Sequence, residues 1–388
     1  MPTRLSPRQR VYLSLALFAA VAIIAVGWLL QGTPDRVPRT EFTVDMSIKQ
    51  VASALDVTGK SLARELGLPL DVSKSTPLKT LGVTPEQLDH ATEHVLGHRE
   101  TTLKYYLFGA VVLFALVYLV RLGRPDGSSI DERKSWYPQW PYVVSLILAV
   151  AFCGFALGKS PNPMESAVKV FKSMVGLYPS VIDKVLGFCF FAALAVIGAK
   201  LICGWACPFG ALQELIYHLP ILRRLKKRRI PFAVSNGIRG LLFVATLVIL
   251  FGIVGGHEGL VIYHYINPFN LFNFDFDTVA IAVFIAALLV VSLGFYRPFC
   301  QFVCPFGLLS WFLERLSIFR VRVDRHRCID CGACDRACPL EAAKGRVAGR
   351  MFPADCFSCG RCLNVCPTDA IHYELVGTKH RDVSAKSE

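Results

Sequence analysis

Long apolar runs recur along the chain from residue 11 to residue 296, separated by shorter polar stretches. A helix needs roughly 17–25 apolar residues to cross the hydrocarbon core of a membrane, and six of the runs are long enough. They cover residues 11–30, 103–121, 142–158, 185–202, 238–256 and 279–296. The pattern predicts a mainly α, polytopic membrane protein with about six spans. The first span falls within residues 1–30, and a membrane domain covers residues 103–310.

The positions of Lys and Arg predict the orientation of these spans, because short cytoplasmic loops carry an excess of both. Three arginines precede the first run, and a basic stretch covers residues 223–229. The loop over 257–278 has no Lys or Arg and is expected outside, whereas four lysines in the loop over 159–184 fit this topology less well. Both termini are therefore expected in the cytoplasm. A signal peptide is the alternative for the first run, although the run is long and no small-residue cleavage site follows Leu30.

Composition agrees with a membrane protein. Hydrophobic residues make up 53% of the chain and charged residues 18%, and the mean hydropathy is +0.46, which is too apolar for an ordinary soluble domain. The net charge of +13 lies mostly beside the predicted spans, where it sets topology and attracts anionic lipid. We therefore expect the lipid bilayer, and no nucleic acid, as a partner.

Residues 31–102 interrupt the apolar pattern and predict a small helical domain on the periplasmic side. Ser47 and Thr58 each open a short helical pattern. Thr84 followed by Pro85 and Glu86 is typical of a helix start, with an N-cap residue, a first-turn proline and an acid. The role of this domain stays open between docking a periplasmic partner and acting as a spacer or cap.

Two cysteine runs near the C-terminus share the spacing C-x2-C-x2-C-x3-C-P, which bacterial-type ferredoxins use to hold 4Fe–4S clusters. Three cysteines of each run reach one cluster, and the fourth crosses to the other. The first cluster is assigned to Cys328, Cys331, Cys334 and Cys366, and the second to Cys356, Cys359, Cys362 and Cys338. We expect an α+β two-cluster ferredoxin domain over residues 320–375, followed by a flexible tail over 376–388.

Structural zinc and disulfides explain these eight cysteines less well. Zinc sites usually pair two C-x2-C knuckles across a longer gap, and they need neither a third cysteine two residues on nor a trailing proline. Disulfides need an oxidising compartment, and the charge pattern places this segment in the cytosol.

The membrane part contains an internal repeat that ends in cysteines. The segment from Lys200 to Gly210 aligns with the segment from Arg297 to Gly307, and each holds a C-x3-C-P motif after a long apolar run. Duplicated helical hairpins tend to pack about a pseudo-two-fold axis with a functional site between the copies. Four thiols are therefore expected near that axis: Cys203, Cys207, Cys300 and Cys304.

Three interpretations of these four thiols stay open. One is a third redox metal centre, since thiolates suit iron–sulfur clusters and copper(I). A second is a cycle between dithiol and disulfide, although a spacing of i, i+4 on a helix holds the sulfurs farther apart than a disulfide needs. The third is packing, because free cysteine behaves as a small buried apolar residue.

A multi-span chain with two C-x3-C-P elements and a cytosolic two-cluster ferredoxin tail resembles the membrane-bound polyferredoxins of the NapH, NosR and CcoG type. The likeness covers about residues 140–372 and leaves out the insert at 31–102. It implies a multi-pass protein of the bacterial cytoplasmic (inner) membrane that passes electrons between the quinol pool and a partner respiratory redox protein. It also implies that quinone binds, and that any enzyme activity is that of an oxidoreductase component.

Quinol oxidation needs groups that remove protons, and histidines near the membrane surface suit this task because their pKa lies near working pH. His257 and His264 in the outer loop are the candidates. The alternative function is an assembly factor, in which the C-x3-C-P thiols bind and reduce copper for delivery to a respiratory enzyme.

Overall fold

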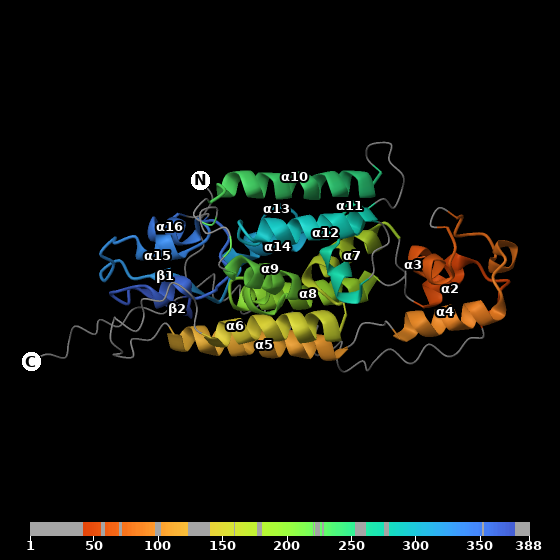
Figure 1. Ribbon diagram of the computed structural model, residues 1–388, viewed down its shortest axis with the longest axis horizontal. Helices are drawn as coiled ribbons and strands as arrows, with labels where there is room; N and C mark the ends of the chain where they lie inside the picture. The colour runs from red at the N-terminus through yellow and green to blue at the C-terminus, as the bar shows by residue number, and fades with distance from the viewer. Residues whose placement is uncertain are drawn as a thin grey trace, which may run out of the picture.

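The structure is a computed structural model that describes residues 42–55, 59–69, 72–97, 102–122, 140–158, 160–176, 181–219, 221, 226, 229–252, 261–274, 279–350 and 353–376. The first predicted span, over 11–30, and the predicted tail from residue 377 onward lie outside these ranges. Three parts follow one another along the longest axis: a small helical domain, a central helical bundle and a ferredoxin domain (Figure 1). The two smaller parts therefore lie at opposite ends of the bundle.

The small helical domain is built from short helices around its own core. They are α2 (Ile48–Ala54), α3 (Gly59–Glu65), the 3-10 helix η1 (Leu78–Leu81) and α4 (Pro85–Gly97). Capping boxes fix two of the helix starts, because Ser47 exchanges hydrogen bonds with Gln50, and Thr84 with Gln87. Buried aliphatic side chains of this domain form a cluster separate from the core of the bundle.

The central bundle is built on long apolar helices that coincide with five of the predicted spans. They are α5 (Thr102–Leu122), α6 (Trp140–Leu148) continuing as the π-helix η3 (Ala149–Ala156), α8 (Val181–Ile197), α10 (Phe232–Leu250) and α12 (Val279–Ser292). Among the described helices, Leu103–Leu122 and Phe232–Leu250 are long and apolar enough to cross a membrane. The segments Trp140–Ala156 and Val279–Ser292 are apolar but shorter. The six-span topology therefore stays a prediction.

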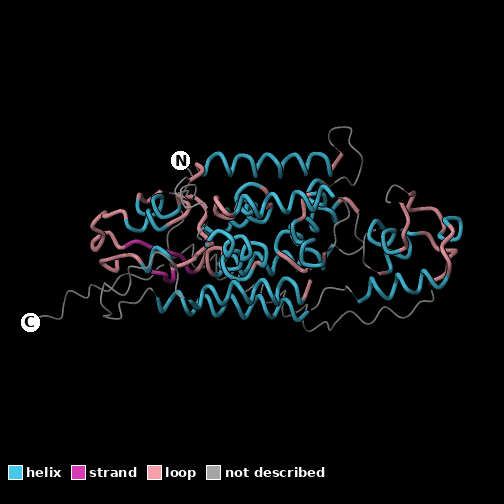
Figure 2. The backbone as a smooth tube through the Cα atoms, viewed as in Figure 1, coloured by secondary structure: helices cyan, strands magenta, loops and turns pink. Residues whose placement is uncertain are grey.

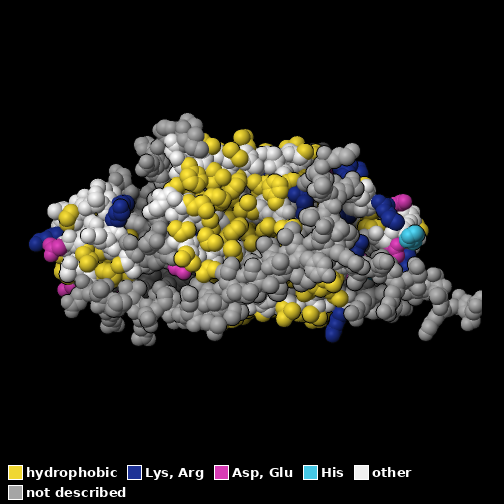
Figure 3. Space-filling model, turned by 180° about the vertical axis from the view of Figure 1, so that it is seen from behind, with side chains coloured by type: hydrophobic (Ala, Val, Ile, Leu, Met, Phe, Trp, Pro, Cys, Tyr) yellow, Lys and Arg dark blue, Asp and Glu magenta, His cyan; other side chains and the backbone are white. Residues whose placement is uncertain are grey.

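The outside of the bundle carries apolar side chains. Seen from behind, hydrophobic side chains gather over the central helices, and charged side chains lie mostly toward the two ends (Figure 3). Leu241 is 73% exposed and Val279 is 81% exposed. Exposed apolar surface of this extent marks contact with a partner or a membrane.

Short helices fill the space between the long ones (Figure 2). Those in the loops expected outside are α7 (Pro163–Met174), α11 (Ile262–Tyr265) and the 3-10 helix η6 (Pro268–Asn273). Those that carry or follow the repeated cysteines are the π-helix η4 (Ile202–Ala206), α9 (Pro208–His218), α13 (Pro298–Phe302), α14 (Pro305–Leu313) and the 3-10 helix η7 (Glu314–Leu316). Helix α7 packs against α14, and η6 packs against η3 and α12. The outer loops therefore reach into the bundle.

The C-terminal domain combines a two-stranded sheet with short helices. Strand β1 (Phe319–Val323) pairs antiparallel with β2 (Ile371–Leu375), so that Val321 lies opposite Tyr373. The helices are α15 (Ala333–Ala337), α16 (Ala342–Val347) and α17 (Arg361–Asn364). The prediction of a mostly helical chain with a C-terminal ferredoxin domain is confirmed.

Candidate functional site

Both C-x3-C-P motifs adopt the same local conformation. Lys200 and Arg297 occupy matching places in the repeat and have positive φ angles of 66° and 46°. The second cysteine of each motif caps the next helix with nearly the same dihedrals, φ −66° and ψ 116° at Cys207 and φ −64° and ψ 116° at Cys304. Proline follows each of these cysteines at the first helical position, which its fixed φ favours. The repeat of the sequence is therefore also a repeat of backbone geometry.

A helix ends between the two cysteines of each motif. Cys203 lies in η4 and Cys207 follows it, while Cys300 lies in α13 and Cys304 lies beyond its end. The expected i, i+4 placement on one continuous helix is therefore wrong. The proline after the second cysteine starts a new helix, so the two sulfurs of a motif are not confined to one helical face.

The four thiols gather in the interior of the bundle. Cys203, Cys207 and Cys300 are each less than a tenth exposed. Cys300 lies within electrostatic range of the other three thiols, and Cys203 within range of Cys207 and Cys304. Within the described residues, no three Cys, His, Asp or Glu side chains converge closely enough to hold a single metal ion. The structure thus brings the four predicted thiols into one region, but their sulfur atoms do not surround a single metal-ion position.

Each repeat contributes a buried cation that donates hydrogen bonds to backbone carbonyls of the other repeat. Arg297 starts the second motif and donates to the carbonyl oxygens of Cys203 and Gly204, the latter at 2.8 Å. Lys200 starts the first motif and donates to the Gly307 carbonyl oxygen at 3.0 Å. Both cations are fully buried. These reciprocal bonds fix the two cysteine-bearing segments relative to each other.

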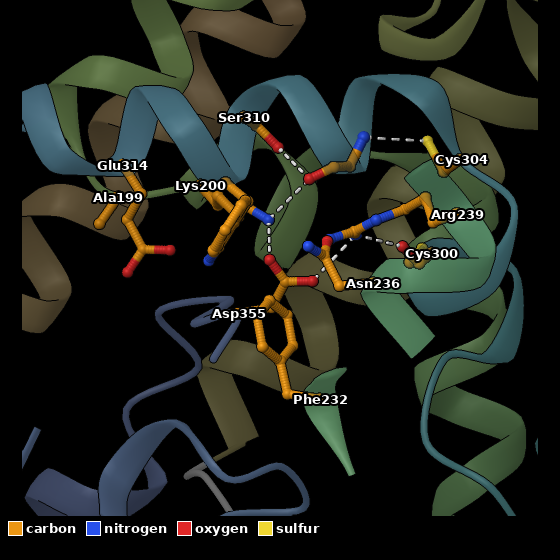
Figure 4. Close-up of polar contacts among 12 residues, drawn as sticks. Ala199, Lys200, Phe232, Asn236, Arg239, Cys300, Cys304, Ser310, Glu314 and Asp355 are labelled. Carbon is orange, nitrogen blue, oxygen red and sulfur yellow. Dashed lines mark hydrogen bonds and ion pairs between the residues drawn. The ribbon is translucent and has the colours of Figure 1, made fainter. Parts of the chain in front are cut away.

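Asp355 ties the ferredoxin domain to the bundle (Figure 4). Its buried carboxylate pairs with Lys200 and, at 2.9 Å, with Arg239 of α10. Arg239 also donates to the Cys300 carbonyl oxygen at 3.0 Å. Burial alone would raise the pKa of Asp355, but the two cations hold that pKa below its ordinary value. Because Asp355 directly precedes Cys356, this ion pair fixes a ferredoxin cysteine segment against both repeats.

Glu214 of α9 forms a second buried group of charges. Its carboxylate pairs with Arg297 at 2.7 Å and with Arg361, which directly precedes Cys362. Burial would raise the pKa of Glu214, but the two arginines hold it well below its ordinary value. His218, 3.0 Å from the same carboxylate, has a pKa lowered by burial. Its neutral ring can accept the hydrogen bond from Arg361, whose Nη2 lies 2.6 Å from Nε2.

Positive charge exceeds negative charge in these two groups. Four buried cations face two buried carboxylates: Lys200, Arg239, Arg297 and Arg361 against Asp355 and Glu214. Burial raises the pKa of the Cys203 and Cys304 thiols, and the cations oppose this rise, Lys200 and Arg297 at Cys203 and Arg239 at Cys304. Buried charges are stable only when they are compensated. Ionised thiolates, unlike neutral thiols or disulfides, supply the compensating charge.

The eight ferredoxin cysteines line two cavities. Around the outer cavity, of about 360 Å³, lie Cys328, Cys331, Cys334 and Cys366. Around the inner cavity lie Cys338, Cys356, Cys359 and Cys362. The structure thus brings together the same two sets that the spacing assigns to separate clusters. The outer cavity reaches the surface, where Ile329 is 64% exposed.

Buried donors without a hydrogen-bond partner line the inner cavity. They are the Tyr296 hydroxyl, Nε and Nη1 of Arg361 and Nε of Arg346. A buried donor left unpaired costs about 1–3 kcal/mol. A group with several sulfur acceptors inside the cavity satisfies such donors, and four cysteine thiolates are the usual ligands of such a group. The residues present therefore fit a 4Fe–4S cluster.

The inner ferredoxin loop lies directly on the first cysteine motif. The Trp205 indole N–H donates to the Ser358 carbonyl oxygen at 2.9 Å, and the Ser358 hydroxyl donates to the Ala199 carbonyl oxygen at 2.8 Å. A Cβ atom added at Gly204 would lie 2.0 Å from the Phe357 carbonyl oxygen. The two backbones approach this closely because residue 204 has no side chain.

The outer loops reach the same region from the opposite side. The rings of Phe269 in η6 and Phe209 in α9 lie 6.0 Å apart. Gly154 in η3 lies close to both Phe272 and Pro208, which directly follows Cys207. The four-cysteine region therefore lies between the outer loops and the inner ferredoxin loop. Of the predicted histidines, His257 lies outside the described residues, and for His264 only the backbone is described.

The sequence patterns do not indicate the buried polar residues that build this region. They are Gln213, Glu214, Arg239, Asp355 and Arg361. One signal was available, because Arg239 falls inside the predicted span 238–256, and an ionisable residue within a span usually has a buried partner or a function. The others lie outside the predicted spans and carry no such signal.

Two family models match the chain. A model described as a 4Fe-4S binding domain matches residues 185–229 and 276–325, which contain both C-x3-C-P motifs. A model described as a 4Fe-4S dicluster domain matches residues 327–370, which contain all eight ferredoxin cysteines.

The regulatory protein NosR of Pseudomonas aeruginosa is 34% identical over 160 residues, which is 39% of this chain and 22% of NosR. The ferredoxin-type protein NapH of Escherichia coli is 31% identical over 154 residues, which is 37% of this chain and 49% of NapH. Over these segments the chain is similar to NapH/NosR-type 4Fe–4S proteins. An uncharacterized protein of Methanocaldococcus jannaschii is 30% identical over 42% of this chain and 58% of its own length.

The chain covers less than two thirds of the length of each of these relatives. No solved structure matches it. The family models and the relatives thus support iron–sulfur electron transfer.

Proposed function

We propose that this NapH/NosR-type protein holds two 4Fe–4S clusters in its ferredoxin domain and transfers electrons through them. Cys328, Cys331, Cys334 and Cys366 hold the outer cluster, and Cys356, Cys359, Cys362 and Cys338 hold the inner one. The observation that carries this assignment is the partition of the eight cysteines between two cavities. When bound, such clusters accept and release single electrons.

A third thiolate-ligated metal centre is held by Cys203, Cys207, Cys300 and Cys304. The gathering of the four thiols in one buried region supports this assignment, and so does the excess of buried cations around them. Thiolates bound to a metal remain ionised in the interior, where free thiols would stay protonated. Neutral, packed thiols would add no negative charge, and only the inner cluster, beside Arg361, would then offset the excess of buried cations.

The protein passes electrons between the quinol pool and a respiratory redox partner. The position of the four-cysteine region supports transfer across the bundle, because it touches the outer loops through Phe209 and Pro208 and the ferredoxin loop through Gly204. The chain is a multi-pass protein of the bacterial inner membrane, with the ferredoxin domain in the cytoplasm and residues 31–102 in the periplasm. His257 and His264 are the candidate proton acceptors for quinol.

The test is anaerobic EPR of the detergent-purified protein before and after addition of a quinol, with dithionite as the positive control. Cluster signals that appear with quinol support a quinol dehydrogenase component, and His257→Gln should then slow their appearance. Signals that appear only with dithionite contradict quinol oxidation. They favour the alternative, in which a cytoplasmic donor supplies electrons for copper reduction at the four thiols.

A further inference from the structure

Gln213 of α9 is a fully buried amide beside the four thiols. Its Oε1 lies 3.8 Å from the Cys300 sulfur, and its Nε2 has no hydrogen-bond partner. A buried amide donor without an acceptor is energetically unfavourable. Within the described part of the chain, the protein therefore provides no hydrogen-bond acceptor for the amide N–H group of Gln213.

The chemistry of the sulfur explains the unpaired amide. A neutral thiol donates to the amide oxygen, whereas a thiolate can only accept. Half a turn of the amide exchanges Oε1 and Nε2, because the two atoms occupy nearly equivalent places. An ionised Cys300 would thus receive the N–H that now lacks an acceptor.

The repeat shows that this amide is not a general feature of the fold. The equivalent position after the second motif is Ser310, whose hydroxyl donates to the Gly307 carbonyl oxygen of its own helix at 3.2 Å. Gln213 instead reaches across from the first repeat to the cysteine of the second. Only the first repeat therefore offers, at this position, a side chain that contacts a cysteine of the other repeat.

We propose that Gln213 donates a hydrogen bond to the Cys300 thiolate when the four cysteines hold their metal centre, and so raises the reduction potential of that centre. The inference rests on the third centre of the proposed function. A donor to a ligating sulfur stabilises the reduced form, which carries more negative charge. Gln213 is a positioning and tuning residue and does not itself ligate the metal.

The test is an EPR-monitored potentiometric titration of the full-length protein with Gln213→Met, which keeps the length of the side chain and removes the donor. The signal of the third centre is identified as the one lost in Cys203→Ser/Cys300→Ser. We expect unchanged iron content, a more negative midpoint potential for that signal, and unchanged signals from the ferredoxin domain. Ser310→Ala is the matched control and should leave all midpoints unchanged.

Two outcomes overturn the inference while the third centre stands. One is an unchanged midpoint and line shape in the fully loaded Gln213→Met protein. The other is loss of iron from both Gln213→Met and a second variant, Gln213→Leu, because a tuning residue is not required for loading. If wild-type protein shows no signal that depends on Cys203 and Cys300, the third centre and this inference fail together, and the two ferredoxin clusters are unaffected.

Discussion

Gly204 sits where the bundle and the ferredoxin domain are closest. The Phe357 carbonyl oxygen occupies the place that a Cβ atom would take, and Trp205 next to it donates to the Ser358 carbonyl. Backbone atoms cannot move aside as a flexible side chain can. The absence of a side chain at this one position therefore fixes how closely the inner cluster site approaches the first cysteine motif.

Gly204→Ala should loosen the contact between the two domains. The added methyl group would force the 357 carbonyl away, with an expected loss of about 1–3 kcal/mol for overpacking. Limited proteolysis should release the ferredoxin domain faster than in wild type, and the apparent Tm should fall. Gly109→Ala on α5 is the matched control, because a Cβ atom there meets nothing within 4 Å. Equal proteolysis of the two variants would contradict the role given to Gly204.

At the scale of the elements, the two repeats differ in which carboxylate pairs with the buried cation that starts each cysteine motif. Lys200 is held by Asp355 of the ferredoxin domain, whereas Arg297 is held by Glu214 of the first repeat. Glu214 also pairs with Arg361. Both ion-pair groups therefore include a residue of the ferredoxin domain, so the repeats and that domain stabilise one another.

Glu214→Gln should destabilise the bundle strongly, because it leaves Arg297 and Arg361 buried without their carboxylate. Removing one partner of a buried ion pair typically costs about 3–5 kcal/mol. Glu165→Gln, which affects a partly exposed pair with Lys169, should cost less than about 1 kcal/mol. Thermal unfolding in detergent at pH 7 measures the loss of stability in both variants. A smaller loss for Glu214→Gln than for Glu165→Gln would contradict the role given to the Glu214 ion pairs.

The pH dependence of stability follows from the direction in which the pKa of Glu214 is shifted. Its folded-state pKa is lowered, so its stabilisation is complete above the unfolded value of about 4.3 and is lost as pH falls through the folded value. The difference in Tm between wild type and Glu214→Gln should therefore be constant near neutral pH and should shrink only in strong acid.

The ferredoxin cysteines could be predicted because their spacing along the chain encodes their positions around each cavity. The apolar runs likewise predicted where the long helices lie. The ion pairs could not be predicted, because Glu214 and Arg297 are 83 residues apart and Lys200 and Asp355 are 155 residues apart. Arg297 ends an apolar run as a cytoplasmic flank residue does, yet it is fully buried. Only the packing of the two repeats reveals its partner.

At the scale of the whole molecule, the chain places the four-cysteine region between two structurally different ends (Figure 1). The small helical domain lies at one end of the bundle and the ferredoxin domain at the other (Figure 1). The outer loops and the inner ferredoxin loop meet the cysteine motifs from opposite sides. A site in this position can connect the two sides of the bundle.

The most direct test of this account is the reduction of the ferredoxin clusters by quinol in proteoliposomes that hold wild type or Cys203→Ser/Cys300→Ser. Duroquinol is the electron donor, EPR of the ferredoxin clusters is the readout, and dithionite shows that the clusters are intact in both proteins. We predict cluster reduction by duroquinol in wild type and at least a tenfold slower reduction in the variant. Equal rates in the two proteins would contradict the claim that electrons cross the bundle at the four cysteines.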